Sequence, residues 1–116
     1  MPFALRWTTE AAEVYRGLRE RALQVSENRG KHGIDKSSRE EGLFKQVYKC
    51  VSLLGENPRH PGLHTHEYDS LENPFERGGK VFEAYAQNRT PGAYRVFWCY
   101  GPGRQEITII DITAHP

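Results

Sequence analysis

Apolar residues recur along the chain with two different periods, and these periods predict its helices and strands. In residues 9–25 they recur every three or four positions, which predicts an amphipathic helix with one apolar stripe, and residues 43–54 repeat the pattern. Phe3–Trp7 alternates instead and predicts a short strand before the first helix. Turn sequences separate three further predicted strands, which are rich in β-branched and aromatic residues: 80–87, 94–100 and 106–113.

Two polar segments lack either period and are predicted to be loops. Residues 26–38, SENRGKHGIDKSS, contain two glycines and would connect the two helices. Residues 57–79 are rich in Pro, Gly and His, and we expect at most a short strand near His64–Tyr68 within them.

The predicted order is strand, helix, helix and a three-stranded meander. Both helices must bury their apolar stripes on one face of a mostly antiparallel sheet, so the fold class is a two-layer α+β domain. The length of 116 residues fits a single domain, 1–116. The opposite face of the sheet would be left uncovered by the chain, and polar strand residues could act there.

Composition restricts the class of protein further. The chain is 37% hydrophobic and 27% charged, which fits a soluble globular protein, and no apolar run approaches the ~18 residues needed to cross a bilayer. The first residues show no signal-peptide pattern. Cys50 and Cys99 are flanked by apolar residues and lack metal-ligand spacing, so we expect buried free thiols in a reducing cytoplasm.

Charge is nearly balanced overall, at +1, but unevenly distributed. Residues 77–104 carry five cationic side chains against Glu83 alone, which suits an anionic partner, although solvated surface charge is the commoner explanation. Arg95 lies in this segment, within the aromatic run AYRVFWCYG. Strand alternation places Arg95 and Cys99 on one face and Tyr94 and Trp98 on the other, without deciding which face the helices cover.

Three stretches together resemble the RelE/ParE superfamily of bacterial toxins: FALRWTTEAAEVYRGL, GAYRVFWCYG and ITIIDITAHP. The resemblance covers nearly the whole chain and rests most on the Tyr-Arg strand. It implies a cytoplasmic toxin that is neutralised by an antitoxin protein. Members of that superfamily are either ribosome-dependent mRNA endonucleases, which need no cofactor, or gyrase poisons.

The endonuclease branch implies a set of site residues. Arg95 would contact the scissile phosphate, and His115 would act as acid or base together with His66 or Glu83. Glu83 could instead form a cross-strand ion pair with Arg95 or Lys80. The remaining residues would bind RNA through charge or stacking: Arg77, Lys80, His64, Tyr85 and Tyr100.

Other interpretations of the same residues stay open. His60, His64 and His66 beside Glu67 invite a metal site, but nothing supplies a fourth ligand, and we expect no metal. His115 could be a frayed terminal residue, and the tyrosines could be half-buried core. The near-neutral charge lends weight to a non-catalytic binding module on the same fold.

Overall fold

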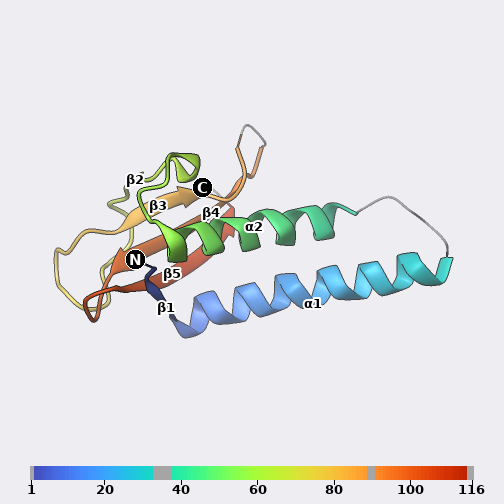
Figure 1. Ribbon diagram of the computed structural model, residues 1–116, viewed down its shortest axis with the longest axis horizontal. Coiled ribbons are helices and arrows are strands. Elements are labelled where there is room, and N and C mark those ends of the chain that lie inside the picture. Colours follow the sequence, from blue (N-terminus) through green and yellow to red (C-terminus); the bar gives the residue numbers. More distant parts are fainter. Residues whose placement is uncertain (1, 33–37, 89–90, 115–116) are drawn as a thin grey trace.

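A hairpin of two helices lies on one face of a five-stranded sheet (Figure 1). The computed structural model describes residues 2–32, 38–88 and 91–114. The elements follow in the order β1 (Ala4–Trp7), α1 (Thr9–His32), α2 (Arg39–Glu56), the 3-10 turn η1 (Pro61–Leu63), β2 (His66–Glu67), β3 (Phe82–Tyr85), β4 (Tyr94–Tyr100) and β5 (Glu106–Ala114). The expected α+β fold class is therefore confirmed.

The sheet has the strand order β1-β5-β4-β3-β2. β1 runs parallel to β5, and the other neighbours are antiparallel, as a meander requires. β3 is shorter than the predicted strand over residues 80–87, and the short strand expected near His64–Tyr68 is confirmed as β2. Among the helices that the structure describes, none is both long and apolar enough to cross a membrane.

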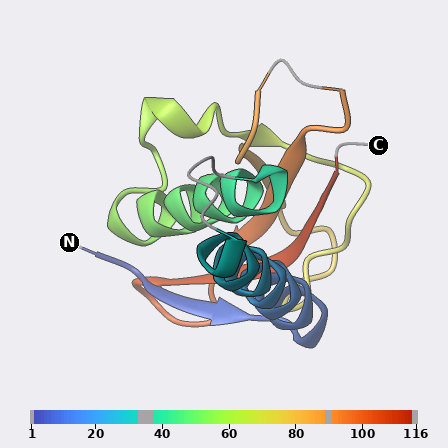
Figure 2. The ribbon, with the colours of Figure 1, turned by 90° about the vertical axis from the view of Figure 1, so that its right-hand side faces the viewer.

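The core lies between the helical hairpin and the sheet. Leu18 of α1 and Leu54 of α2 pack there with Val96 and Trp98 of β4. Figure 2, which views the hairpin from its end, shows both helices on the same side of the strands. The apolar stripes predicted from the sequence therefore serve the purpose expected of them, which is to cover one face of the sheet.

Both helices are longer than their predicted apolar stripes, and the predicted loop over residues 26–38 is wrong at its start but confirmed at its end. α1 continues to His32, where Arg29 Nη2 lies 2.8 Å from the Glu41 carboxylate of α2. α2 already begins at Arg39, because Ser38 and Glu41 form a reciprocal capping box. The hairpin therefore extends beyond the sheet (Figure 1), and residues 33–37 lie outside the described part.

One extra residue in β5 keeps the core face continuous. Phe97 of β4 pairs with Asp111, whereas Trp98 pairs with Ile109, so Ile110 is a bulge. The bulge allows Ile109 and Ile112, three positions apart, both to be buried in the core. In β4 itself alternation is regular: Val96 and Trp98 pack toward the helices, and Arg95 points away from them.

The opposite face of the sheet is partly covered, contrary to expectation. The ring of Tyr68, just after β2, lies 4.6 Å from the ring of Phe97. Phe97, Cys99 and Glu83 on this face are all buried. In Figure 2 the yellow segment that follows β2 crosses the side of the sheet away from the helices. Periodicity could not have predicted the contact between Tyr68 and Phe97, because the two residues are far apart in the sequence.

Candidate functional site

Strand register brings four of the predicted site residues onto the sheet face away from the helices. His66 of β2 pairs with Glu83 of β3, and Tyr85 of β3 pairs with Arg95 of β4. Glu83 and Tyr85 are two positions apart, so both side chains leave the strand on the same side. The pleat thus places an imidazole, a carboxylate, a phenol and a guanidinium side by side.

The shortest contact in this group joins His66 to Glu83. Nε2 of His66 lies 2.6 Å from Oε1 of Glu83, and Nδ1 lies 3.2 Å from the carbonyl oxygen of His64. Both partners are acceptors, so the doubly protonated imidazole, in which both ring nitrogens donate, satisfies both contacts. The side chain of His66 is 49% exposed, whereas that of Glu83 is 1% exposed. A buried carboxylate therefore holds an imidazole that solvent and ligands can reach.

Arg95 lies beneath this surface and is only 7% exposed. Its Nη1 donates to the carbonyl oxygens of Gln87 and Tyr94, and its Nε lies 3.8 Å from Oε2 of Glu83, an ion pair that is too long for a hydrogen bond. The guanidinium carbon lies 3.7 Å from the centre of the Tyr85 ring. Contacts on several sides therefore fix the guanidinium in place.

These contacts decide some of the predictions made for Arg95 and leave another untested. It does face away from the helices, and the alternative of a cross-strand ion pair with Glu83 is confirmed. The ring of Tyr85 covers Arg95, so its guanidinium is not on an open surface. A direct contact between Arg95 and a phosphate stays a prediction, and it would require the Tyr85 ring to move. The geometry fits better with Arg95 as a positioning residue for Glu83.

Tyr85 also gathers two imidazoles. The rings of His64 and His66 have their centres 5.4 and 5.8 Å from that of Tyr85. His64 adopts a left-handed backbone conformation, with φ of 48°, at the end of η1. We call His64, His66, Glu83, Tyr85 and Arg95 the His66 cluster. Its outer part is two imidazoles, and its inner part is a buried ion pair.

The other residues predicted to bind RNA lie outside the His66 cluster. Lys80 Nζ lies 3.2 Å from the Glu67 carboxylate, and Arg77 is exposed in the loop before β3. Both line a hollow of about 450 Å³ that also contains Glu67, Asp69 and Glu72. Three carboxylates beside two cations make this hollow poorly suited to a polyanion. The RNA-binding role of Arg77 and Lys80 stays a prediction.

Tyr100 lies on the opposite face from Arg95. Its ring is in edge contact with Trp98, with centres 5.0 Å apart, and Trp98 belongs to the core under the helices. Tyr100 therefore cannot join Tyr85 in stacking on one RNA segment over the cluster. His115, predicted to act as acid or base, falls outside the described residues.

No metal centre is formed by the described residues, in which no three His, Cys, Asp or Glu side chains converge closely enough to hold an ion. His60 caps η1, where its Nδ1 accepts a hydrogen bond from Gly62 N at 2.9 Å. Cys50 and Cys99 are free and buried, as predicted.

Two residues that hold the cluster gave no signal in the sequence. Gln87 offers its backbone carbonyl to Arg95, and its side-chain oxygen accepts from Tyr94 N at 3.0 Å. Tyr68 covers Phe97 beside the cluster. A backbone acceptor can come from any residue type, and a single loop tyrosine has no periodicity, so neither could have been found without the tertiary structure.

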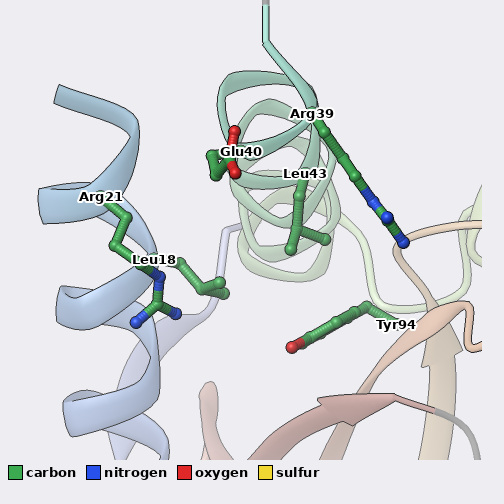
Figure 3. Close-up of a pocket in the computed structure, with 6 residues that line it drawn as sticks. All are labelled: Leu18, Arg21, Arg39, Glu40, Leu43 and Tyr94. Carbon is green, nitrogen blue, oxygen red and sulfur yellow. The ribbon is translucent and has the colours of Figure 1, made fainter. Parts of the chain in front are cut away.

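The helical hairpin forms a separate hollow of about 340 Å³ (Figure 3). Leu18 of α1, Leu43 of α2 and the ring of Tyr94 give it an apolar base, while Arg21 and Arg39 enter from the two helices. Glu40 is the one carboxylate among these lining residues. Such a surface matches a segment that presents apolar and acidic side chains together.

Two helices packed on a five-stranded mixed sheet, in the order found here, are the fold of the RelE/ParE-like toxins. A YoeB/ParE toxin from Agrobacterium tumefaciens superposes with a TM-score of 0.60 at 9% identity, over 97% of this chain and 99% of that one. YoeB from Staphylococcus aureus, solved as a dimer, gives 0.56 at 10% identity over the full length of both chains.

A third similar structure is an archaeal RelE–RelB complex from Pyrococcus horikoshii OT3, with a TM-score of 0.54 at 11% identity, covering 98% of this chain and 96% of that one. No protein-family model and no curated protein matches the sequence. The expected RelE/ParE-like fold is thereby confirmed. At these identities the likeness concerns the fold and leaves the chemistry to be argued from the residues.

Proposed function

We propose that this protein is a toxin-like endoribonuclease that cleaves mRNA without a metal. The observation that carries the proposal is the contact between the half-exposed imidazole of His66 and the buried carboxylate of Glu83. An imidazole held by a carboxylate is a common arrangement for proton transfer near neutral pH. The fold shared with YoeB and RelE toxins supports the toxin-like part of the proposal.

The reaction needs a proton acceptor on one side of the phosphate and a proton donor on the other. In the proposed step His64 takes the proton of the 2′-hydroxyl, and the 2′-oxygen attacks the adjacent phosphorus. The bond from phosphorus to the 5′-oxygen breaks, and His66 gives its proton to that oxygen. The products are a 2′,3′-cyclic phosphate and a free 5′-hydroxyl, and no external oxidant, metal or cofactor takes part.

Glu83 and Arg95 act through His66 in this scheme. Glu83 is buried, so it holds His66 Nε2 rather than touching RNA, and Arg95 neutralises Glu83 from below. The protonated His66 also places positive charge where the phosphorane develops negative charge. To reach the substrate, Nδ1 of His66 would exchange its 3.2 Å contact with the carbonyl oxygen of His64 for a contact with an RNA oxygen.

The proposed setting is the cytoplasm, with the ribosome presenting mRNA and an antitoxin restraining the toxin. The similar RelE was solved in complex with RelB, which supports a protein partner of that kind. On this chain the hairpin hollow with Leu18, Arg21, Arg39 and Leu43 is the surface that fits such a partner (Figure 3). Its two arginines and apolar base call for acidic and apolar side chains.

A second candidate is a binding module without catalysis, or a gyrase-inhibiting toxin on the same fold. The observation that favours it is the burial of Arg95 and Glu83, which leaves His64, His66 and the half-buried ring of Tyr85 to meet RNA. These candidates predict toxicity or binding that does not depend on His66. They also predict intact mRNA, and the gyrase inhibitor predicts DNA breaks instead.

The test is expression of the full chain, followed by mapping of mRNA ends in cells and with purified ribosomes. We expect cuts that carry 2′,3′-cyclic phosphate and fall about 100-fold or more in His66→Gln and in His64→Gln, since acid–base groups contribute on that order. His115→Ala tests the remaining predicted acid or base in the same assay.

His32→Gln is the matched control, because His32 is the last residue of α1. That helix runs from the sheet to the far end of the hairpin (Figure 1). It should cleave like the unaltered protein. Intact mRNA with the unaltered protein, on and off the ribosome, would contradict the proposal. Cuts that survive in His66→Gln would remove His66 from the mechanism.

A further inference from the structure

A third hollow, of about 460 Å³, lies near η1, and its aromatic lining belongs to the helix side of the sheet. Three aromatic rings line it: Phe82 of β3, and Trp98 and Tyr100 of β4. Phe82 stacks on Trp98 with centres 4.8 Å apart, and Tyr100 stands edge-on to both. We call this hollow the Trp98 pocket. Its volume is in the range of small-molecule sites, and its walls suit a flat ring.

Two buried polar atoms of this pocket's lining residues lack a hydrogen-bonding partner among the described residues. They are the indole nitrogen of Trp98, a residue that is 1% exposed, and the hydroxyl of Thr65. A buried polar group without a partner loses its hydrogen bonds to water and gains none in return, so such groups are rare in a stable fold. An indole N–H can only donate, and the described residues give that of Trp98 no acceptor, so an acceptor on a bound ligand would satisfy it.

The rim of the pocket adds donors and positive charge. Arg59 is exposed there, beside His60. Because His60 Nδ1 accepts from Gly62 N, its neutral ring carries the proton on Nε2 and offers a second donor. All four polar groups named here can donate hydrogen bonds. The fitting ligand is a flat ring that bears acceptors and is joined to an anionic group.

We infer that the Trp98 pocket binds a ribonucleotide, with the base against Phe82 and Tyr100, beside the buried indole of Trp98, and the phosphate on Arg59. Base–aromatic stacking and an arginine–phosphate contact are the two interactions that nucleotides offer together. The pocket lies on the opposite face from Arg95, although His64 lines it and also contacts Tyr85. The inference concerns binding and holds whether or not the protein cleaves RNA.

The nucleotide has two possible sources, a free mononucleotide or one residue of an RNA strand. The indole N–H signals in proton–nitrogen NMR spectra distinguish them, because the chain has two tryptophans. Trp7 in β1 packs its ring against Tyr15, away from the pocket, and is an internal control. The probes are each of the four ribonucleoside 5′-monophosphates, inorganic phosphate, and single-stranded RNA of about six nucleotides.

We expect a saturable shift of the Trp98 indole signal while the Trp7 signal stays in place. A shift with a monophosphate identifies a site for free nucleotides, and a shift with RNA alone identifies a site for a strand. No shift of the Trp98 signal with any probe would overturn the inference. An equal shift with inorganic phosphate alone would also overturn it, because the base would then contribute nothing.

Two variants test the polar contacts without touching the core tryptophan. Arg59→Ala should weaken binding of the monophosphate or RNA about tenfold, the effect of one lost charge-assisted hydrogen bond, while Arg16→Ala on the exposed side of α1 should not. Thr65→Val should weaken binding and yet leave the fold at least as stable, because the hydroxyl lacks a described partner. Unchanged affinity in both Arg59→Ala and Thr65→Val would contradict the proposed contacts.

Discussion

Glu83 and His66 face each other across two antiparallel strands, with 2.6 Å between Oε1 and Nε2. The carboxylate is buried, the imidazole is half exposed, and Arg95 lies on the inner side of the carboxylate. Glu83 thus links a buried cation to a surface ring. A charge change at this one position should therefore affect both the stability of the sheet and the reactivity of its surface.

Glu83→Gln keeps the shape of the side chain and removes its charge. Arg95 then stays buried after losing its Glu83 counter-ion, and removing one partner of a buried pair costs about 3–5 kcal/mol. We expect the free energy of unfolding to fall by about 3 kcal/mol, measured by urea denaturation followed by circular dichroism. Cleavage of mRNA should fall as well, because His66 loses the group that holds Nε2.

Glu67→Gln is the matched control. Glu67 also belongs to the paired strands β2 and β3, but its carboxylate forms an exposed ion pair with Lys80. Exposed pairs contribute about 0–1 kcal/mol, so this variant should unfold almost like the unaltered protein. Equal losses of stability in the two variants would contradict a special role for the buried pair.

Ser38→Ala tests what starts α2. The variant removes the hydroxyl that accepts from Glu41 N at 3.1 Å, and N-cap losses cost about 1 kcal/mol. We expect the melting temperature to fall by roughly 4 °C, measured by scanning calorimetry. Ser70→Ala, at an exposed loop position, is the control and should melt like the unaltered protein. A melting temperature unchanged in Ser38→Ala would mean that hairpin packing alone sets the helix start.

Arg6 of β1 donates from Nε to Glu106 of β5 at 2.7 Å. This hydrogen bond is the main cause that lowers the pKa of the Glu106 carboxyl below its ordinary 4.5, and Gly103 N adds to it. Because the folded pKa is lowered, the stabilisation is present above about pH 4.5 and is lost as the pH falls through the folded pKa. Both residues are at the β1–β5 pairing, the one parallel contact of the sheet.

Arg6→Ala should raise the pKa of Glu106 back toward its ordinary value, as followed by carbon NMR of the carboxyl group. Arg16→Ala, which removes an exposed arginine of α1, should leave that titration unchanged. The same Glu106 titration in Arg6→Ala as in the unaltered protein would show that the hydrogen bond does not set the pKa.

The two thiols should be inert in the folded protein. Burial raises the pKa of Cys50 to about 12 and that of Cys99 to about 11, so neither forms thiolate near pH 8. We expect a chromogenic disulfide reagent to react with neither thiol until urea unfolds the chain, and then with both. Fast reaction of one thiol before unfolding would show that its segment opens locally.

Alkaline pH should weaken the fold for the same reason. Unfolded thiols ionise near pH 9, whereas the folded ones keep their protons to about 11 and 12. The stability that depends on these protons is therefore lost as the pH rises from about 9 through the folded pKa values. Urea midpoints measured between neutral and alkaline pH check the sign, which is a decrease.

Several properties followed from the sequence because they depend on local periodicity. The two apolar stripes, the alternation in residues 94–100 and the turn sequences around them were enough to predict an α+β domain and its element order. The length of α1 could not be predicted in this way, because its last turns are held by an ion pair between Arg29 and Glu41 of α2, which is a contact between helices.

The candidate site was likewise predictable from the sequence only in part. Sequence reasoning selected His64, His66, Glu83, Tyr85 and Arg95, and the structure brings these five together. It also selected Tyr100, Arg77 and Lys80, which lie elsewhere. Residue type points to possible chemistry, but the distance between two side chains depends on strand pairing.

By itself, the sequence determined which residues form helices and strands and which side chains are able to exchange protons. Only the tertiary structure decided that Arg95 is covered, that Glu83 joins it to His66, and that Trp98 lines a pocket with its indole nitrogen unpaired among the described residues. The physical reason is that secondary structure arises from neighbours along the chain. Burial and hydrogen-bond partners arise from residues that register and packing bring together across it.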